Sequence, residues 1–283
     1  MIMREFIVEA DDGVNLSVVE KITGSNSRHK ILLVHGSGCG WEYWDVPLNN
    51  YSIMDGLAKH GFAVYALECR GYGRSDRPDG RTITVARMAA DVALVAHEIC
   101  GTDEKIGLVG HSSSGIVVLM AGAETSGIWS RLAVLNAPYR RINPQFEAYA
   151  SQMIKAAETE GNDTVPNGHH LEIETRLNEP EDKIIDWYKD LISVSYPRIP
   201  AAVFADVVEN PTIPLIPDVH VPTLLINGSN EYVVDPADAL DLLNDLGVDD
   251  KGVVILPGSY HLPFLEKRGH RDLLDYLKFW FSR

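Results

Sequence analysis

A serine at a predicted tight turn is the first candidate for chemistry in this chain. Ser112 lies in Gly-His-Ser-Ser-Ser-Gly, residues 110–115, between the apolar runs 106–109 and 116–121. The first run is typical of a buried strand and the second of a helix, so Ser112 is expected at a strand–turn–helix junction. Such a turn projects the hydroxyl above the sheet edge, beside unpaired N–H groups at the helix N-terminus. We interpret Ser112 as a nucleophile.

A serine hydroxyl is a weak nucleophile unless a neighbouring base removes its proton. The chain has ten histidines, and His261 is the best placed of them. It follows the last apolar run, 253–256, at the carboxyl end of a predicted strand. The carboxyl ends of parallel strands meet at one edge of a sheet, so His261 and Ser112 are expected on the same edge. His261 is the predicted base.

A catalytic histidine is usually oriented by a carboxylate. Two candidates follow the apolar run 223–226, Glu231 and Asp235. Asp235 comes directly before a proline and a helical pattern, where capping of the helix N-terminus explains it. Glu231 has no such explanation, so we predict that Glu231 orients His261. The order serine, acid, histidine differs from both serine-protease orders.

Acyl-transfer chemistry also needs backbone N–H donors for the oxyanion that forms. The run His-Gly-Ser-Gly-Cys-Gly, residues 35–40, follows the first predicted buried strand and lets backbone approach a substrate closely. The predicted oxyanion hole consists of the N–H groups of Ser37 and Ser113, with Gly38 as the alternative to Ser37. A dinucleotide-binding loop is excluded because Trp41 occupies the third glycine position.

Aromatic residues gather just after this glycine-rich run and again later in the chain. Trp41, Tyr43 and Trp44 form the first group, and Trp187 and Tyr188 form the second. Aromatic side chains are common both in binding pockets and in cores, and the sequence leaves these two interpretations open. If the five residues line a substrate pocket, the substrate is apolar or aromatic.

The elements that must position these residues are visible as six short, continuous apolar runs. They are 31–34, 63–67, 106–109, 132–135, 223–226 and 253–256. Runs without alternation are typical of parallel strands that are buried on both faces. Helical periodicity appears between runs, over 85–99, and after the last run, over 273–281. We predict an α/β fold with a mostly parallel, doubly wound sheet.

Two segments depart from the strand–helix alternation. Residues 4–10 and 15–22 alternate apolar and polar side chains around a turn signal, which predicts an N-terminal antiparallel hairpin. Residues 139–217 contain amphipathic helical patterns and prolines but no buried-strand run, and they are too long for a loop. We predict that 139–217 form a helical cap inserted into a core made of 1–138 and 218–283.

Composition narrows the classes of partner and ligand. Among 283 residues, 40 acidic and 25 basic side chains give a net charge of −15, which disfavours nucleic acid and anionic membranes. The widely spaced Cys39, Cys69 and Cys100 indicate neither a disulfide framework nor a thiolate metal site. We expect no cofactor and no metal. Without a visible signal peptide or spanning segment, a cytoplasmic location is expected. The oligomeric state is left open.

Together these motifs resemble the α/β-hydrolase superfamily, in the branch of serine hydrolases with a helical cap. The matching segments are His-Gly-Ser-Gly at 35–38, Arg-Gly-Tyr-Gly-Arg-Ser at 70–75, residues 110–115, Pro-Thr-Leu-Leu-Ile-Asn-Gly at 222–228, and Pro-Gly-Ser-Tyr-His at 257–261. The resemblance implies hydrolysis of a carboxylic ester or lactone of a small, largely apolar substrate through an acyl-enzyme at Ser112. Three residues depart from the family pattern. Ser114 replaces a glycine, and Glu68 and Glu231 replace aspartates; we expect a structural role for Glu68.

Other activities on this scaffold stay open at the level of the sequence. The alternatives are a ligand-binding protein or receptor with slow turnover, an amide or carbon–carbon bond hydrolase, and an acyltransferase. A cofactor-independent oxygenase or lyase is a weaker alternative. Within the family, haloalkane dehalogenases and epoxide hydrolases use an aspartate nucleophile, so the serine at position 112 argues against both.

Overall fold

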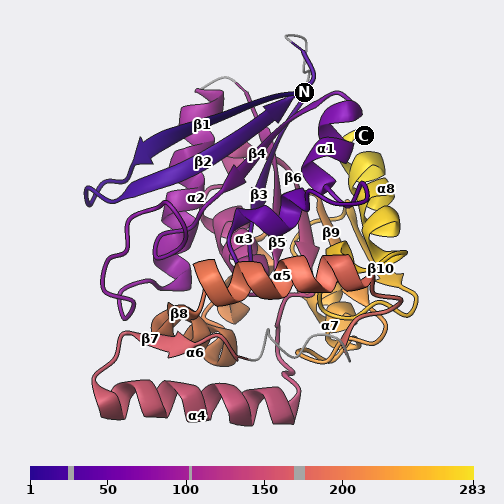
Figure 1. Cartoon of the computed structure of the whole chain (residues 1–283). Helices are drawn as coiled ribbons and strands as arrows, with labels where there is room; N and C mark the ends of the chain where they lie inside the picture. Colours follow the sequence, from indigo (N-terminus) through magenta and orange to yellow (C-terminus); the bar gives the residue numbers. More distant parts are fainter. Residues whose placement is uncertain (25–28, 102–103, 169–175) are drawn as a thin grey trace.

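An eight-stranded sheet forms the centre of the computed structural model, which describes residues 1–24, 29–101, 104–168 and 176–283 (Figure 1). Its strands are β1 (Ile2–Glu9), β2 (Asn15–Ile22), β3 (His29–Val34), β4 (Phe62–Leu67), β5 (Ile106–His111), β6 (Trp129–Leu135), β9 (Thr223–Gly228) and β10 (Lys251–Leu256). Their order across the sheet is β1-β2-β4-β3-β5-β6-β9-β10. Strands β1 and β2 pair antiparallel, as do β2 and β4, and all other neighbours are parallel. The predicted fold and its N-terminal hairpin are confirmed.

Burial explains why continuous apolar runs predicted these strands. Every residue of β4, β5 and β9 is buried, whereas the edge strand β1 is mostly exposed. When helices cover both faces of a strand, all its side chains are removed from water, so apolar residues at every position stabilise it. A strand at the edge of the sheet has no such requirement.

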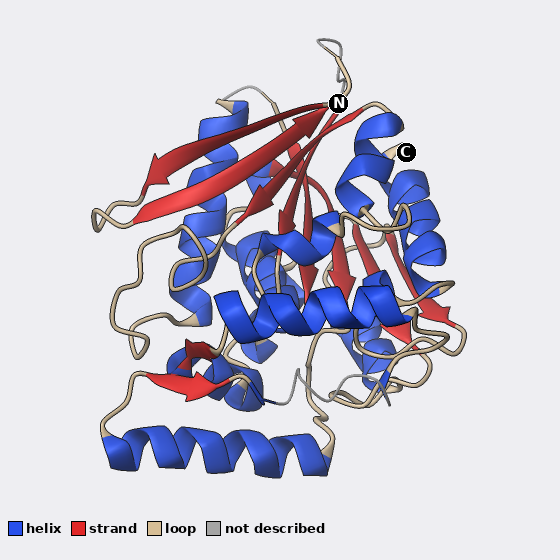
Figure 2. Cartoon of the chain, viewed as in Figure 1, coloured by secondary structure: helices blue, strands red, loops and turns tan. Residues whose placement is uncertain are grey.

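Helices cover both faces of the sheet (Figure 2). They are α1 (Ile53–Lys59), α2 (Val85–Cys100), α3 (Ser113–Glu124), α7 (Asp238–Asp245) and α8 (Gly269–Phe281), with short 3₁₀ turns η1 (Trp41–Asp45), η2 (Ser126–Ile128), η5 (Ile213–Asp218) and η6 (Pro263–Leu265). Helix α2 packs against α3, and α1 packs against α8. The periodic patterns over 85–99 and 273–281 correspond to α2 and α8. No helix in the described parts of the chain is long and apolar enough to span a membrane.

Most of the remaining secondary structure lies between β6 and β9, in the segment predicted as a cap. It comprises α4 (Pro144–Glu160), β7 (Thr164–Pro166), α5 (Asp182–Ser195), β8 (Arg198–Pro200) and α6 (Ala201–Glu209). In Figure 1 these elements lie beyond the ends of the parallel strands, with α5 crossing in front of the sheet. The segment is not wholly helical as predicted, because β7 and β8 pair antiparallel. Three-residue strands that contain proline are too short to give a periodic pattern. Residues 169–175 of this segment lie outside the described residues.

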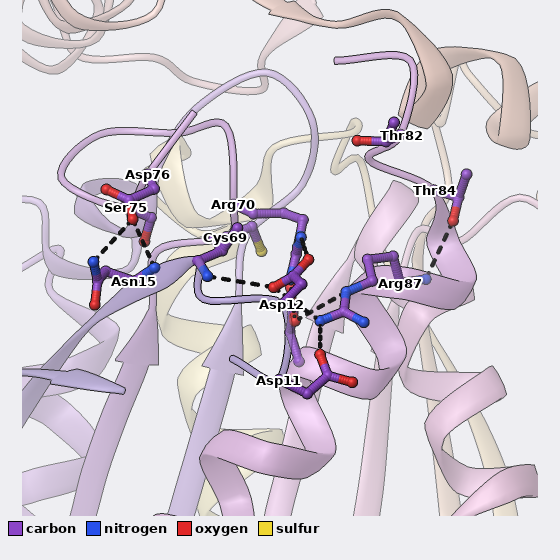
Figure 3. A network of polar contacts seen from close by, with 12 residues as sticks. Asp11, Asp12, Asn15, Cys69, Arg70, Ser75, Asp76, Thr82, Thr84 and Arg87 are labelled. Atoms are coloured by element: carbon purple, nitrogen blue, oxygen red, sulfur yellow. Dashed lines mark hydrogen bonds and ion pairs between the residues drawn. The ribbon is translucent and has the colours of Figure 1, made fainter. Parts of the chain in front are cut away.

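A polar network fixes the hairpin turn to the loop that follows β4 (Figure 3). The buried Arg70 guanidinium donates to Asp91 of α2 at 2.5 and 2.6 Å and to Asp12 of the turn at 2.8 Å. Asp76 accepts from the backbone and side-chain nitrogens of Asn15 at 2.8 and 3.0 Å. The Arg-Gly-Tyr-Gly-Arg-Ser motif therefore has a structural role that joins three elements.

Candidate active site

Ser112 occupies the turn between β5 and α3 in a strained backbone conformation, with φ +55° and ψ −123°. The surrounding glycines are needed for close packing. A Cβ on Gly110 would lie 2.2 Å from the Ser114 carbonyl oxygen, and a Cβ on Gly115 would lie 2.4 Å from Ala137 Cβ. Ser114, which departs from the family glycine, donates its hydroxyl to the His35 carbonyl. Its extra side chain thus ties the turn to the glycine-rich loop.

The structure brings Ser112, His261 and Glu231 together from the ends of β5, β10 and β9. His261 Nε2 lies 2.9 Å from Ser112 Oγ, and His261 Nδ1 lies 2.9 Å from Glu231 Oε2. The three residues are only 8%, 4% and 9% exposed, in the order serine, histidine, glutamate. Such an arrangement places a base on the hydroxyl and a carboxylate behind the base, as nucleophilic catalysis requires.

Glu231 and Asp235, the two candidates for the orienting carboxylate, make different contacts. Glu231 Oε1 accepts the backbone N–H groups of Tyr232 and Val233 at 2.8 and 2.7 Å, so Oε2 is held toward the histidine. Asp235 Oδ1 accepts the N–H of Ala237 at 2.9 Å and does not contact His261. Helix α7 begins only at Asp238, so the prediction that Asp235 caps this helix is wrong. Asp235 instead closes a turn just before the helix.

His111, the residue before the serine, links the histidine loop to the glycine-rich loop. Its Nε2 lies 2.8 Å from the His261 carbonyl oxygen, and its Nδ1 lies 3.2 Å from the Tyr43 hydroxyl. Burial holds the pKa of His111 well below its usual value, so the ring is neutral. The carbonyl fixes the proton on Nε2, which leaves Nδ1 to accept from Tyr43. The Tyr43 oxygen in turn accepts the Gly36 N–H.

Asn136 joins the two loops that carry the acid and the base. Its Nδ2 donates to the carbonyl oxygens of His261 and Tyr260 at 2.9 and 3.3 Å, and its Oδ1 accepts the Gly228 N–H at 2.9 Å. Neither this role of Asn136 nor that of His111 was predicted from the sequence. Both positions lie next to a predicted strand end, which was the only available signal.

The N–H of Ser37 is oriented by the peptide that contains it. The Gly36 carbonyl oxygen of this peptide lies 2.8 Å from His35 Nδ1, and His35 Nε2 accepts the Cys69 N–H at 3.0 Å. Burial lowers the pKa of His35 to about 4, so the neutral ring carries its proton on Nδ1 and donates to Gly36. A trans peptide points its C=O and N–H in opposite directions. The Ser37 N–H is thereby directed away from His35.

The other predicted oxyanion donors are also constrained. The Ser37 carbonyl accepts the Tyr72 hydroxyl at 3.0 Å, which fixes the direction of the Gly38 N–H. Ser113 is the first residue of α3, where a backbone N–H has no partner within the helix. Ser37 and Gly38 line the same cavity as Ser112. The geometry leaves both as alternatives for the donor opposite Ser113.

A small cavity lies against Ser112 and His261. Its described lining consists of Gly36, Ser37, Gly38, Cys39, Tyr43, His111, Ser112, Phe146, Tyr188, Tyr232, Val233, His261 and Leu262. Counted together with the space open to solvent at its mouth, its volume is about 370 Å³, and a neighbouring hollow that shares Phe146 and Tyr232 measures about 1030 Å³ on the same basis. The lining combines residues of the sheet edge with Phe146 of α4 and Tyr188 of α5.

The five predicted pocket aromatics divide between the cavity and the core. Tyr43 and Tyr188 line the cavity, whereas Trp41, Trp44 and Trp187 are not among its lining residues in the described parts of the chain. For these three, the structure supports packing in the core, the other interpretation that the sequence left open. Trp44 is fully buried beside Phe264, and the other two tryptophans pack against the core. Adjacent aromatics on one short helical turn point in different directions, so they cannot all face one cavity.

Glu68 has the structural surroundings expected of it. Its Oε1 lies 2.9 Å from the Tyr196 hydroxyl, which also lies 2.7 Å from Glu42 Oε2. Burial, reinforced by the neighbouring Glu42 carboxylate, raises the pKa of Glu68 to about 7. A Cβ on Gly40 or Gly73 would come within 2.1 Å of the Glu68 carboxylate. The two glycines make room for this longer acid under the glycine-rich loop.

Known proteins with similar sequences and structures are hydrolases. The chain is 26% identical over 143 residues to a triacylglycerol lipase of Pseudarthrobacter phenanthrenivorans, covering 50% of this chain and 43% of the lipase. The chain thus spans less than half the length of that relative. It is 23% identical to a monoacylglycerol lipase of Mycolicibacterium smegmatis, over 92% of this chain and 98% of that protein.

The fold has close counterparts among solved structures. A thermophilic esterase from Thermogutta terrifontis superposes with a TM-score of 0.76 at 22% identity, covering 98% of this chain and 99% of the esterase. The family model described as serine aminopeptidase, S33, matches residues 25–268. That match spans strands β3 to β10, the candidate triad and the segment between β6 and β9, so the chain belongs to the serine aminopeptidase S33 family of α/β hydrolases.

Proposed function

We propose that this protein is a serine hydrolase that cleaves a carboxylic ester or lactone of a small, largely apolar substrate through an acyl-enzyme at Ser112. One observation carries the proposal. Ser112, His261 and Glu231 form an unbroken path of 2.9 Å contacts at a strained turn beside a helix N-terminus. This path supplies a nucleophile, a base and an orienting carboxylate in the positions that acyl transfer needs.

In the first half-reaction, Ser112 Oγ attacks the substrate carbonyl carbon while His261 Nε2 takes the hydroxyl proton. The carbonyl oxygen becomes an oxyanion, which accepts hydrogen bonds from the N–H groups of Ser113 and of Ser37 or Gly38. The intermediate collapses as the carbon–oxygen bond to the alcohol breaks and His261 returns its proton to that oxygen. The acyl group stays on Ser112.

In the second half-reaction, water replaces the alcohol. His261 Nε2 takes a proton from the water, whose oxygen attacks the acyl carbon and forms a second oxyanion at the same donors. The bond to Ser112 Oγ then breaks, and His261 protonates the serine. Glu231 holds the Nδ1–H tautomer of His261 in both halves and stabilises the transient imidazolium. The carboxylic acid leaves the site.

We further propose that residues 139–217 act as a cap on a core made of 1–138 and 218–283. Phe146 and Tyr188 from this segment line the cavity at Ser112, which supports a role in selecting substrates. With Val233 and Leu262 they give the cavity an apolar wall. The small empty volume favours short acyl or alcohol groups over long lipid chains.

The test is a panel of p-nitrophenyl esters of increasing acyl length, together with simple lactones. We expect turnover that is highest for short acyl chains and falls steeply for long ones. Ser112→Ala should lower kcat by several orders of magnitude and keep the melting temperature close to that of the wild type. A fluorophosphonate probe should label Ser112.

Two results would contradict this function. Tight binding of small esters with turnover no faster than in Ser112→Ala would identify a binding protein. Labelling at Ser113 or Ser114 in place of Ser112 would show that the nucleophile is wrongly assigned.

A further inference from the structure

We propose that Asn167 is a positioning residue for the oxyanion loop, defined as residues 35–40, although it lies more than a hundred residues away in the sequence. The inference rests on the proposed ester hydrolysis and identifies a feature of the segment between β6 and β9 that this reaction needs. Asn167 follows β7 and is only 1% exposed. It does not line the cavity, so it acts through the loop and not on the substrate.

The Asn167 side-chain amide donates two hydrogen bonds, one to the oxyanion loop and one within its own segment. Its Nδ2 donates to the Gly38 carbonyl oxygen at 2.6 Å and to the Tyr196 carbonyl oxygen at 2.8 Å. The Asn167 backbone N–H donates to the Pro197 carbonyl at 3.0 Å, which fixes the residue itself. A primary amide has two N–H bonds, so one side chain satisfies both carbonyls.

The oxyanion loop needs such support because of its composition. Gly36, Gly38 and Gly40 alternate along it, and glycine has the greatest backbone freedom of any residue. Three successive carbonyl groups of the loop have separate hydrogen-bond partners. The Gly36 carbonyl is held by His35, the Ser37 carbonyl by Tyr72, and the Gly38 carbonyl by Asn167. His35 belongs to the loop itself and Tyr72 follows β4 in the core, whereas Asn167 belongs to the segment between β6 and β9.

Removing the Asn167 contact frees the peptide that follows Gly38. Rotation of that peptide changes ψ of Gly38. The two preceding peptides keep their hydrogen bonds to His35 and Tyr72, but the Gly38 and Ser37 N–H groups lose the restraint on their C-terminal side and are held less narrowly. Preorganised donors stabilise an oxyanion because they need not reorient during the reaction. A loosened loop therefore binds the ground-state substrate as before and stabilises the transition state less well.

Tyr196 makes a second contact between the same segment and the same loop. Its hydroxyl and ring pack on Gly40, where a Cβ would lie 2.0 Å from the hydroxyl oxygen. The hydroxyl also bridges Glu42 and Glu68, as described above. Asn167 and Tyr196 thus hold the middle and the end of the loop, and Asn167 holds the Tyr196 carbonyl as well.

The experiment compares Asn167→Asp and Asn167→Ala with wild type on the best ester of the panel. We expect kcat to fall roughly 10- to 100-fold, less than the loss of a complete oxyanion donor, with KM within about threefold of wild type. A trifluoromethyl ketone, which adds Ser112 Oγ and forms an oxyanion, should lose affinity in parallel with kcat/KM. The matching methyl ketone should bind as before.

Asn210→Asp is the matched control. Asn210 is buried in the same segment, and its Nδ2 donates to the Pro138 and Tyr139 carbonyls at 3.0 and 2.8 Å, away from the oxyanion loop. This variant loses the same two donor bonds and should lower the melting temperature while kcat stays within about threefold of wild type. If Asn167 contributed only to folding, Asn167→Asp and Asn210→Asp would have the same effects on the melting temperature and on kcat.

The inference is overturned if the Asn167 variants keep wild-type kcat, or if KM rises with kcat unchanged. It is also overturned if Asn210→Asp lowers kcat as much as Asn167→Asp does. Failure of the proposed function looks different. In that case the wild-type protein itself shows no ester turnover and no fluorophosphonate label, before any Asn167 variant is measured.

Discussion

Glu231 uses its two carboxylate oxygens for two different tasks. Oε1 accepts two backbone N–H groups of its own turn, and Oε2 accepts from His261 Nδ1. The turn fixes the carboxylate, and the carboxylate fixes the tautomer of the histidine. At the scale of single residues, the reactivity of this site therefore depends on keeping one proton on His261 Nδ1, so that Nε2 is free to accept the proton of Ser112.

Replacing Glu231 by glutamine tests this arrangement. An amide NH₂ facing Nδ1 favours the wrong tautomer and removes the charge that stabilises the imidazolium. We expect Glu231→Gln to lower kcat on the best ester by roughly 10⁴-fold, with KM little changed. Asp235→Asn is the control, and its kcat should stay within about threefold of wild type. The opposite pattern would assign the acid to Asp235.

At the scale of secondary-structure elements, a buried ion pair holds the N-terminal hairpin to the core. The side chains of Arg70 and Asp91 are 2% and 3% exposed, and Arg70 also reaches Asp12 in the hairpin turn. Because Arg70 follows β4, Asp91 lies on α2 and Asp12 lies in the hairpin turn, one guanidinium joins three elements. Figure 3 shows Arg70 beside Asp12. The same stretch of chain leads to Tyr72, which supports the oxyanion loop.

Arg70→Met should destabilise the fold strongly. The substitution removes both short hydrogen bonds to the buried Asp91 carboxylate, which keeps only Arg87 Nε at 3.7 Å, at a cost of about 3 kcal/mol in the free energy of unfolding. Urea unfolding monitored by tryptophan fluorescence measures this change. Arg81→Met, which breaks the exposed ion pair with Asp79, should leave the free energy of unfolding close to that of the wild type, because solvent screens an exposed pair. Equal effects of the two variants would rule out the structural role of Arg70.

At the scale of the whole molecule, the segment between β6 and β9 contacts the core through the Tyr196 hydroxyl, which lies against two carboxylates, Glu42 and Glu68. One Tyr196 hydroxyl lies within hydrogen-bond distance of both Glu42 and Glu68, yet it has a single proton to donate. Burial raises the pKa of both carboxyls, with Glu68 at about 7. The contact is therefore most favourable when one of the two acids carries a proton.

This contact predicts a pH dependence of stability with a definite sign. Between pH 4.5 and 7, Glu68 is protonated in the folded state and ionised in the unfolded state, so the free energy of unfolding falls as pH rises. The rise in the pKa of Glu68 from 4.5 to about 7 corresponds to a loss of about 3 kcal/mol in the free energy of unfolding as the pH rises through this range. Glu68→Gln should remove most of this slope and be more stable than wild type at pH 8.

Urea unfolding of both proteins at intervals from pH 4.5 to 8 measures this difference. Glu5→Gln, at an acid on the edge strand β1, serves as the control and should keep the wild-type slope over this range. Parallel curves for wild type and Glu68→Gln would show that Glu68 is ionised throughout and would contradict the prediction.

The sequence by itself determined the fold and the order of the candidate catalytic residues. Parallel strands buried on both faces must be continuously apolar, so their positions can be recognised locally. The turn at Ser112 needs small residues at fixed spacings because strand and helix pack closely there, and this requirement also appears in the sequence. Strand order places His261 at this edge, since carboxyl ends of parallel strands meet there, and it also places Glu231 and Asp235 there without choosing between them. The choice of Glu231 rested on a capping role for Asp235 that the structure does not show.

Only the tertiary structure decided which residues surround that edge. Tyr43 faces the cavity and Trp44 faces the core, although they are neighbours in the chain, because the orientation of one short helical turn separates them. Asn136, His111 and Asn167 act through hydrogen bonds to backbone groups about 90 to 150 residues away. Such a bond requires only a polar atom at the right point in space. It therefore leaves no periodicity or spacing in the sequence by which it could be recognised.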